Sequence, residues 1–348
     1  MLYSHKNIYG YMQAIDYWKS LEIDSLDKTQ GILKDFRILF SYHSGVIENT
    51  NIKYLDVKEI FDNRRVINYT GDLVTLYEID NLRISFDYML SKAIDKESLS
   101  EEMIKKFHKL LTSGTYDERR SVVNEERPGE YKKHDYVTGK NEVGSLPVDV
   151  SNDMRSLLKE VNDIELNSDE DVMVLVAYVH NMVEHIHPFA DGNGRLGRLL
   201  INYLLLVNGL PPLIIFNEDK SLYYECLQKF DEDDNLSATV EFLKIEMEKT
   251  WEKVIDKSKG EKNIKHNKLR MFLWFYFELI WVEMIQIKKR CKFLCLHRYG
   301  LCIGLMIYSI EIVSVDSICF CLADGTVTCN IPFSNLAFTS SALMLSPT

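Results

Sequence analysis

Apolar residues recur at the three- to four-residue spacing of amphipathic helices over most of the first 260 positions of the chain. Between residues 113 and 147 this spacing stops, and glycines and prolines predict a long loop that contains a β-hairpin. A loop of this length inside a compact domain is usually functional or disordered. The spacing predicts helices over residues 12–40, 57–62, 70–95, 101–111, 151–164, 169–186, 194–208, 221–230 and 236–258.

The pattern changes near residue 265. Met271 to Ile287 is almost continuously apolar and aromatic, broken by Glu278, Glu283 and Gln286. Three interpretations stay open: a membrane-associated tail, a buried helix followed by short strands, or a sequence not selected for structure, such as a frame-shifted reading. Two glutamates in mid-span are costly in lipid, so we expect no membrane partner. The tail is left unassigned.

Composition narrows the class of protein. The chain has 348 residues, 46% of them hydrophobic and 27% charged, which is ordinary for a packed protein of about two domains. Wholesale disorder, collagen-like repeats and a small disulfide-rich scaffold are excluded. The net charge of −11 argues against a nucleic-acid partner, although a local anion site remains possible. Residues 1–10 lack a signal-peptide core and Cys226 is the one cysteine before residue 291, which together predict a reduced, cytoplasmic chain.

A glycine-rich turn separates the predicted helices 169–186 and 194–208. Gly192 and Gly194 allow backbone conformations in which successive N–H groups turn inward, and such a nest at a helix N-terminus suits phosphate. Arg195 and Arg198 are three residues apart, so they share a helix face and can both reach a polyphosphate. The turn therefore predicts an anion site.

Two further side chains complete this segment. His187 can take a proton near neutral pH, and Asp191 can hold Mg²⁺, which prefers carboxylate and phosphate oxygens. A base, a metal carboxylate, an anion nest and arginines together indicate nucleotidyl or phosphoryl transfer. The chain has no P-loop pattern and no His-Glu-x-x-His pattern, which argues against a P-loop nucleotidase and a zinc protease.

Residues 187–198 resemble the motif of the Fic family, His-Pro-Phe-x-(Asp/Glu)-Gly-Asn-Gly-Arg-x-x-Arg, at every specified position. The resemblance covers about residues 30–255. It implies an all-α fold, a Fic-fold helical bundle with a short β-hairpin flap at about 129–146. Implied boundaries are an N-terminal helical region at 1–110, a catalytic core at 111–255 and a tail of unknown role at 256–348.

The resemblance also implies an activity, the transfer of AMP from ATP to a hydroxyl side chain of a protein. In that reaction His187 is the catalytic base and Asp191 the Mg²⁺ ligand. The nucleotide-binding residues are Gly192, Asn193 and Gly194, around the α- and β-phosphates, and Arg195 and Arg198, at the β- and γ-phosphates. In the related Doc proteins a lysine replaces the second glycine, so Gly194 argues against their kinase variant.

An upstream segment resembles the inhibitory motif of the same family, (Ser/Thr)-x-x-x-Glu-(Gly/Asn). Its residues here are Ser44, Glu48 and Asn49, and His43 stands where a second serine is common. The resemblance implies that Glu48 pairs with Arg198 and occupies the arginine that the γ-phosphate needs. We therefore expect an autoinhibited adenylyltransferase.

Two alternatives to this function stay open. The same site can act in reverse, as a de-AMPylase in which Glu48 activates a water, or the protein can be an inactive regulatory or interaction protein. The expected partner is a protein with an exposed Ser, Thr or Tyr, which includes the chain itself. A homodimer is also left open.

Overall fold

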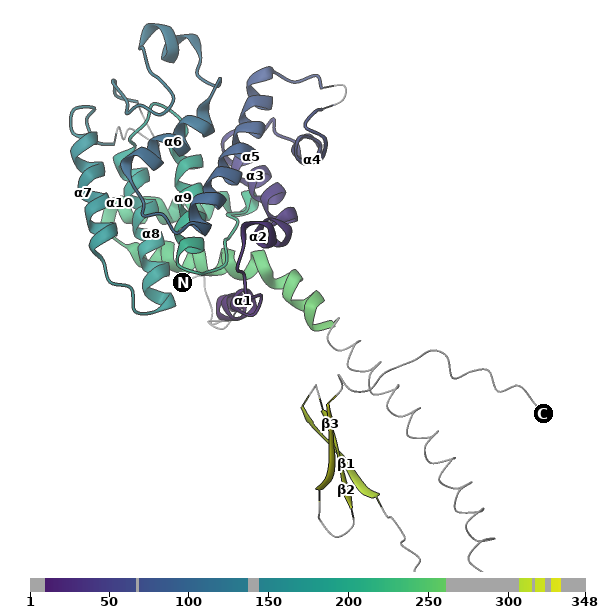
Figure 1. The fold of residues 1–348 in the computed structure, drawn as a ribbon. Helices are drawn as coiled ribbons and strands as arrows, with labels where there is room; N and C mark the ends of the chain where they lie inside the picture. Colours follow the sequence, from purple (N-terminus) through teal and green to yellow (C-terminus); the bar gives the residue numbers. More distant parts are fainter. Residues whose placement is uncertain are drawn as a thin grey trace, which may run out of the picture. The chain divides into compact units, whose positions relative to one another are not determined.

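The computed structural model describes residues 10–66, 69–136, 144–260, 307–314, 317–322 and 327–332. Contacts divide the chain into two compact units, Met1–Ile264 and Lys265–Thr348. In the first, the helical unit, every described regular element is a helix, which confirms the all-α prediction (Figure 1). The predicted hairpin at 129–146 stays a prediction, because residues 137–143 lie outside the described part.

The helices of the helical unit follow the predicted spacing closely, and a further helix occupies residues 236–260. A π-helical turn, Arg119–Val123, and a 3-10 turn, Asn217–Asp219, lie between them. The α-helices are α1 (Gly10–Lys19), α2 (Leu26–Ile32), α3 (Lys34–Glu48), α4 (Tyr54–Asn63), α5 (Leu73–Ile94), α6 (Glu101–Thr112), α7 (Val150–Asp163), α8 (Asp169–Ile186), α9 (Asn193–Val207) and α10 (Lys220–Asp233).

The single helix expected at 12–40 is wrong, because that stretch holds α1, α2 and the start of α3. Glu22 takes a left-handed conformation with φ 47°, which ends the first helical segment. Ser25 then caps α2 by accepting a hydrogen bond from the Lys28 N–H, a residue type that favours a helix start. The third helix continues to Glu48, so the inhibitory motif lies in its last turn.

Helix α9 lies at the centre of the helical unit. Its residues from Arg195 to Leu205 are all buried, and it packs against α3, α5, α6 and α8 (Figure 1). A helix that is covered on all sides needs mainly apolar residues, which the run Leu196 to Leu205 supplies at most positions, Arg198 and Asn202 excepted. The motif arginines on this helix are therefore carried into the interior of the bundle.

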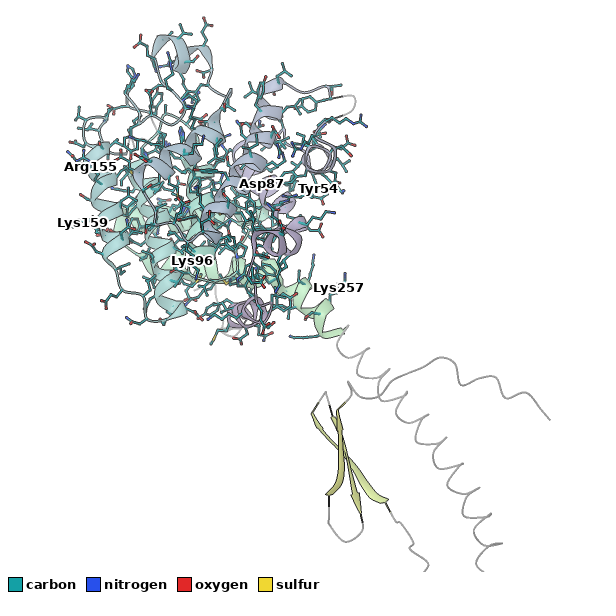
Figure 2. The ribbon with its side chains drawn as sticks, in the orientation of Figure 1. Tyr54, Asp87, Lys96, Arg155, Lys159 and Lys257 are labelled. Atoms are coloured by element: carbon teal, nitrogen blue, oxygen red, sulfur yellow. The ribbon has the colours of Figure 1, made fainter. Side chains whose placement is uncertain are left out.

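Outer helices keep the two-faced pattern. On α7 the side chains of Met154 and Leu157 are buried, whereas Arg155 and Lys159 project from the opposite face into solvent (Figure 2). These exposed residues are four apart and so share one side of the helix. The motif arginines Arg195 and Arg198 are thus buried because they lie on the central helix, whereas charged residues on the outer face of α7 are exposed.

The second unit contains a three-stranded antiparallel sheet. Strands β1 (Ile307–Ser314), β2 (Ser317–Leu322) and β3 (Val327–Pro332) pair in the order β1-β2-β3. Met271 to Ile287, for which sequence left three interpretations, lies outside the described residues. Among the residues that are described, no helix has the length and apolar character needed to cross a bilayer.

Candidate active site

The turn between α8 and α9 begins and ends with left-handed backbone. His187 follows the last residue of α8 with φ 50° and ψ 62°, and its N–H donates to the Val183 carbonyl over 3.0 Å. Gly192 has φ 81° and is the residue before α9, a conformation that glycine adopts without steric cost. The turn thus directs the His187 side chain and the N-terminus of α9 toward the same space.

Asn193 fastens this turn from inside. Its side-chain Oδ1 accepts the Phe189 N–H at 3.0 Å, and its Nδ2 donates to the Phe189 carbonyl at 2.7 Å. The residue is only 1% exposed. The side-chain amide therefore holds the Phe189 backbone, while the backbone N–H of Asn193 lies at the N-terminus of α9.

His108 on α6 fastens the turn from outside. Its Nδ1 accepts the Gly129 N–H at 2.9 Å, so the ring proton lies on Nε2, which donates to the Asp191 carbonyl at 2.8 Å. The ring stacks on Phe189 with centroids 3.7 Å apart. Burial lowers the pKa of His108 to about 3, which keeps the ring neutral. Sequence reasoning missed this residue, since no local pattern marks it.

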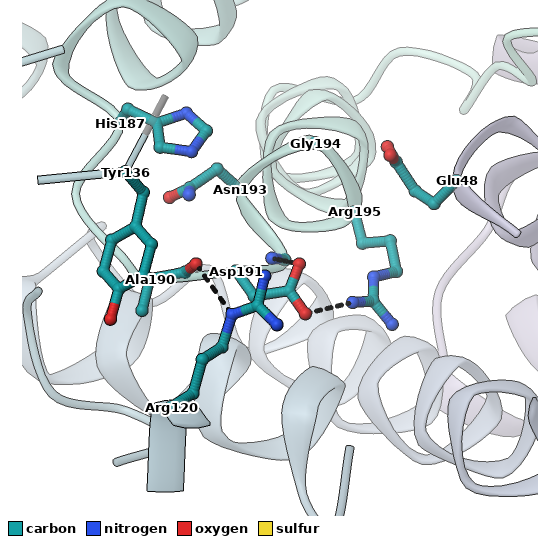
Figure 3. A pocket seen from close by; sticks show the side chains of 10 residues that line it. Glu48, Arg120, Tyr136, His187, Ala190, Asp191, Asn193, Gly194 and Arg195 are labelled. Carbon is teal, nitrogen blue, oxygen red and sulfur yellow. Dashed lines mark hydrogen bonds and ion pairs between the residues drawn. The ribbon is translucent and has the colours of Figure 1, made fainter. Parts of the chain in front are cut away.

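A cavity of about 270 Å³ opens beside the turn. Figure 3 shows His187 and Tyr136 on one side of the cavity and Glu48, from α3, on the other, with Asp191 between them. The structure thus brings together residues from α3 and from the α8–α9 turn. The lining residues are Glu48, Arg120, Tyr136, His187, Ala190, Asp191, Gly192, Asn193, Gly194 and Arg195.

His187 is partly buried at the edge of this cavity. Burial, helped by the positive charge of Lys132, lowers the pKa of His187 to about 4, although Asp191 and Glu48 act in the opposite direction. The imidazole is therefore neutral near pH 7 and has a ring nitrogen able to accept a proton.

Asp191 offers one carboxylate at the mouth of the turn. Its Oδ1 accepts the Gly192 N–H at 2.8 Å, its Oδ2 is 3.7 Å from Arg195 Nη2, and its side chain is 36% exposed. In the described part of the chain no three His, Cys, Asp or Glu residues gather as a metal site. A lone exposed carboxylate fits Mg²⁺ that keeps waters and takes its other ligands from phosphates, and does not fit a metal held by protein alone.

Arg198 is buried against the last turn of α3. Its Nε donates to Ser44 Oγ at 3.0 Å, and its Nη2 donates to the Ser44 carbonyl at 2.9 Å and to Glu48 Oε1 at 2.8 Å. The side chain is 2% exposed. Although burial by itself would lower the pKa of Arg198, the Glu48 carboxylate raises it, so the guanidinium stays charged. Ser44, Glu48 and Arg198, predicted from two separate motifs, thus meet in one cluster.

Glu48 stands beside the first turn of α9. Burial alone would raise its pKa, but the charge and hydrogen bond of Arg198, with Arg195 and Lys220 nearby, lower it below the ordinary value. A Cβ added to Gly194 would lie 2.4 Å from Glu48 Oε1 and 3.0 Å from Arg198 Nη1. A side chain at position 194 therefore does not fit while Glu48 occupies this place.

Two arginine nitrogens near the cavity have no hydrogen-bond partner in the described part of the chain. They are Arg195 Nε and Arg198 Nη1, both buried. Buried donors without a partner are costly and uncommon. An anionic ligand at the start of α9 would supply acceptors where these donors lie.

Three further residues near the cavity were missed by sequence reasoning. Arg120 donates from Nε to the Ala190 carbonyl at 3.4 Å, and Tyr136 donates its hydroxyl proton to buried Glu126 at 3.0 Å. Glu78 on α5 pairs with Arg195, with 3.1 Å between Oε1 and Nη1. Arg120 and Tyr136 lie in the loop over residues 113–147 that the sequence marked only as irregular.

A family model for the Fic/DOC family matches residues 98–205, the segment that holds the α8–α9 turn and both motif arginines. The chain contains a Fic domain. Ser44, Glu48 and Asn49 lie outside the matched residues, so the Fic domain meets the end of α3 as a separate element of the same helical unit.

Curated relatives agree with this assignment. Protein adenylyltransferase Fic from Drosophila persimilis is 29% identical over 210 residues, which are 60% of this chain and 39% of the relative. The relative of the same name from Drosophila melanogaster is 29% identical over 210 residues, 60% of this chain and 40% of its own. The chain thus spans about two fifths of the length of these relatives.

Solved structures share the fold. A Fic-domain-containing signaling protein from Bacteroides thetaiotaomicron superposes with a TM-score of 0.63 at 24% identity, covering 72% of this chain and 97% of that one. Fic-1 from C. elegans superposes with a TM-score of 0.56 at 18% identity, covering 72% of each chain. The Fic fold of the helical unit is therefore common to bacterial and animal proteins.

Proposed function

We propose that this protein transfers AMP from ATP to a Ser, Thr or Tyr hydroxyl of a protein, and that Glu48 restrains the reaction. The observation that carries the proposal is the convergence of a neutral His187 and the N-terminus of α9 on one cavity, with two buried arginines beside it. Relatives named protein adenylyltransferase Fic, 29% identical over 210 residues, support it.

The triphosphate of ATP fits the start of α9. A helix N-terminus carries partial positive charge and unsatisfied N–H groups, which favour phosphate. Here the N–H groups at this terminus belong to Gly192, Asn193 and Gly194, of which that of Gly192 donates to Asp191 Oδ1. The side chains of Arg195 and Arg198 follow on the same helix. Gly194 adds no side chain in front of this terminus, at a place where a Cβ would lie 2.4 Å from Glu48 Oε1.

Asp191 is the residue that would hold Mg²⁺ together with oxygens of the bound nucleotide. Its Oδ2, 3.7 Å from Arg195, faces the same cavity as the proposed phosphates. When bound, the cation would neutralise charge on the phosphates.

His187 acts as the base in this scheme. The target hydroxyl oxygen forms a bond to the α-phosphorus, the bond between the α-phosphorus and the bridging oxygen to the β-phosphate breaks, and pyrophosphate leaves. The hydroxyl proton passes to a ring nitrogen of His187, which is neutral at physiological pH because its pKa is lowered to about 4. Arg195 and Arg198 balance the charge that develops on the leaving pyrophosphate.

Glu48 opposes this arrangement by holding Arg198. Its carboxylate lies 2.8 Å from Arg198 Nη2 and lines the cavity itself. The γ-phosphate and Glu48 are both anions that require the same guanidinium, so they exclude each other. Loss of the Glu48 carboxylate frees Arg198 for the nucleotide.

The direct test uses ATP labelled in either the α- or the γ-phosphate, with Mg²⁺ and an extract of candidate targets. We expect label from the α-position to enter protein, strongly with Glu48→Gly and weakly with the wild type, and mass spectrometry to find AMP on a hydroxyl side chain. His187→Ala in the Glu48→Gly background is the control that should give no label. Transfer of the γ-label instead would refute AMP transfer and indicate a kinase.

A further inference from the structure

Glu78 joins two parts of the site that the sequence motifs leave separate. It lies on α5 with its side chain 13% exposed, and its Oε1 is 3.1 Å from Nη1 of Arg195, which is 3% exposed. Buried ion pairs require good geometry on both partners, because each charge has lost its water. The position of the Arg195 guanidinium is therefore tied to that of Glu78.

The second carboxylate oxygen of Glu78 reaches the end of α3. Asn49, the residue that follows Glu48, donates from Nδ2 to Glu78 Oε2 at 2.7 Å and to Thr75 Oγ1 at 3.0 Å. Thr75 is itself fixed, since its N–H donates to Asp72 Oδ1 at 2.8 Å. One carboxylate thus holds Arg195 with one oxygen and the end of the inhibitory segment with the other.

Glu48 and Glu78 stand on different sides of the arginines that they hold. Glu48 lines the cavity, where a phosphate would lie, whereas Glu78 does not line it. The remaining Nη2 of Arg195 points toward the cavity side, 3.7 Å from Asp191 Oδ2, as Figure 3 shows. A carboxylate behind an arginine orients it, while a carboxylate in front of an arginine competes with the ligand.

We propose that Glu78 is the positioning residue for Arg195 and that, through Asn49, it also anchors the end of α3 that carries Glu48. This inference rests on the proposed function in one respect, that ATP is the ligand of the cavity. Glu78 presents Arg195 to the terminal phosphates and does not touch the nucleotide. Removing its charge should weaken ATP binding, the opposite of the effect expected for Glu48.

The test compares ATP and AMP affinities by titration calorimetry in the Glu48→Gly background, without a protein target. Glu78→Gln keeps the shape of the side chain and removes its charge, and Asp80→Asn on the same helix is the matched control, since Asp80 pairs with Arg83 at 2.8 Å. We expect Glu78→Gln to weaken ATP binding by about 10-fold, the value of one charged hydrogen bond. AMP lacks the terminal phosphates, so its affinity should not change.

Three results would overturn the positioning role. Tighter ATP binding by Glu78→Gln would make Glu78 a competitor like Glu48, an equal loss for ATP and AMP would indicate a general structural defect, and no change would remove the role altogether. Thermal melting of each variant separates misfolding from lost affinity.

If Glu48→Gly binds ATP and the labelled-ATP assay shows no transfer, the proposed function fails, while the inference on Glu78 still stands because it rests on ATP affinity. If Glu48→Gly binds no ATP, both fail.

The anchoring role has its own test in the chain that retains Glu48. Asn49→Ala removes the bonds to Glu78 and Thr75, so the end of α3 is held less firmly and ATP should bind several-fold more tightly than to the wild type. Asn51→Ala is the matched control, because it retains the backbone N–H that donates to Asn49 Oδ1 at 3.0 Å. Equal ATP affinities for Asn49→Ala and Asn51→Ala would refute the anchor.

Discussion

The α8–α9 turn and the end of α3 meet at the same arginine, but they are held in place in different ways. The turn is fastened at its backbone by Asn193 and His108 and continues into a helix that is buried on all sides. The last turn of α3 also packs Ile47 into the core, yet its contacts with the site are polar, through Ser44 and Glu48.

This difference separates a permanent part of the site from a replaceable one. The groups that hold the turn in place are the side-chain amide of Asn193 and the ring of His108, and neither is proposed to bind the nucleotide. Glu48, by contrast, uses the guanidinium that a phosphate would use, so a ligand can take its place without disturbing the core. In this scheme the α8–α9 turn carries the residues that react, and the end of α3 carries the residue that restrains them.

The largest expected effect on AMP transfer follows from removing the proposed base, His187, in the α8–α9 turn. In the Glu48→Gly background, His187→Ala should lower AMP transfer by about 1,000-fold, within the range for loss of a general base. ATP affinity should stay within about twofold, because His187 lies beside the phosphates and is not proposed to bind them. Labelled transfer and calorimetry measure the two quantities, and unchanged transfer would remove His187 from its role.

A smaller effect should follow from loosening the turn itself. His108→Ala removes the bond to the Asp191 carbonyl and the stack on Phe189, so transfer should fall by about 10- to 100-fold through misplacement of the turn. The melting temperature should fall as well, since buried hydrogen bonds and packing are lost. His185→Ala, at an exposed histidine that pairs with Asp231, is the control and should change neither quantity.

The pH dependence of transfer sharpens the assignment of the base. A lowered pKa means that His187 keeps its neutral form as pH falls, and loses it only as pH falls through about 4. Transfer by Glu48→Gly should therefore stay nearly constant between about pH 8 and pH 6, across the ordinary histidine value. A rate that halves near pH 6.5, the ordinary value, would show that burial does not depress this pKa.

The smallest expected effect concerns the tail. The buried core and the site, as described, lie within Met1–Ile264, whereas Lys265–Thr348 forms a separate unit. A chain that ends at Ile264 should fold, melt within a few degrees of the full chain and transfer AMP at the same rate. Insolubility or a much lower melting temperature of the shortened chain would show that the tail completes the fold.

Sequence alone predicts the parts of the site that are close together along the chain. The spacing of residues 187–198 predicts a base, a carboxylate, glycines and arginines in one site. The apolar periodicity predicts nearly every helix. Four residues near the site could not be predicted in this way, because their partners are distant in sequence and their neighbouring residues form no recognisable pattern. They are His108, Glu78, Arg120 and Tyr136. The break of residues 12–40 into separate helices depends on a cap at Ser25 that periodicity does not detect.

The comparison between turn and α3 is tested most directly by labelled AMP transfer in a double-mutant cycle of Glu48 and Arg198. Removing the Glu48 carboxylate should raise transfer by about 10-fold or more, most visibly as self-modification, since breaking the pair on the Glu48 side frees the charge of buried Arg198. Adding Arg198→Ala to Glu48→Gly should abolish that gain. Equal labelling by the wild type and Glu48→Gly would contradict the restraint by Glu48, and a gain that survives Arg198→Ala would show that it acts elsewhere.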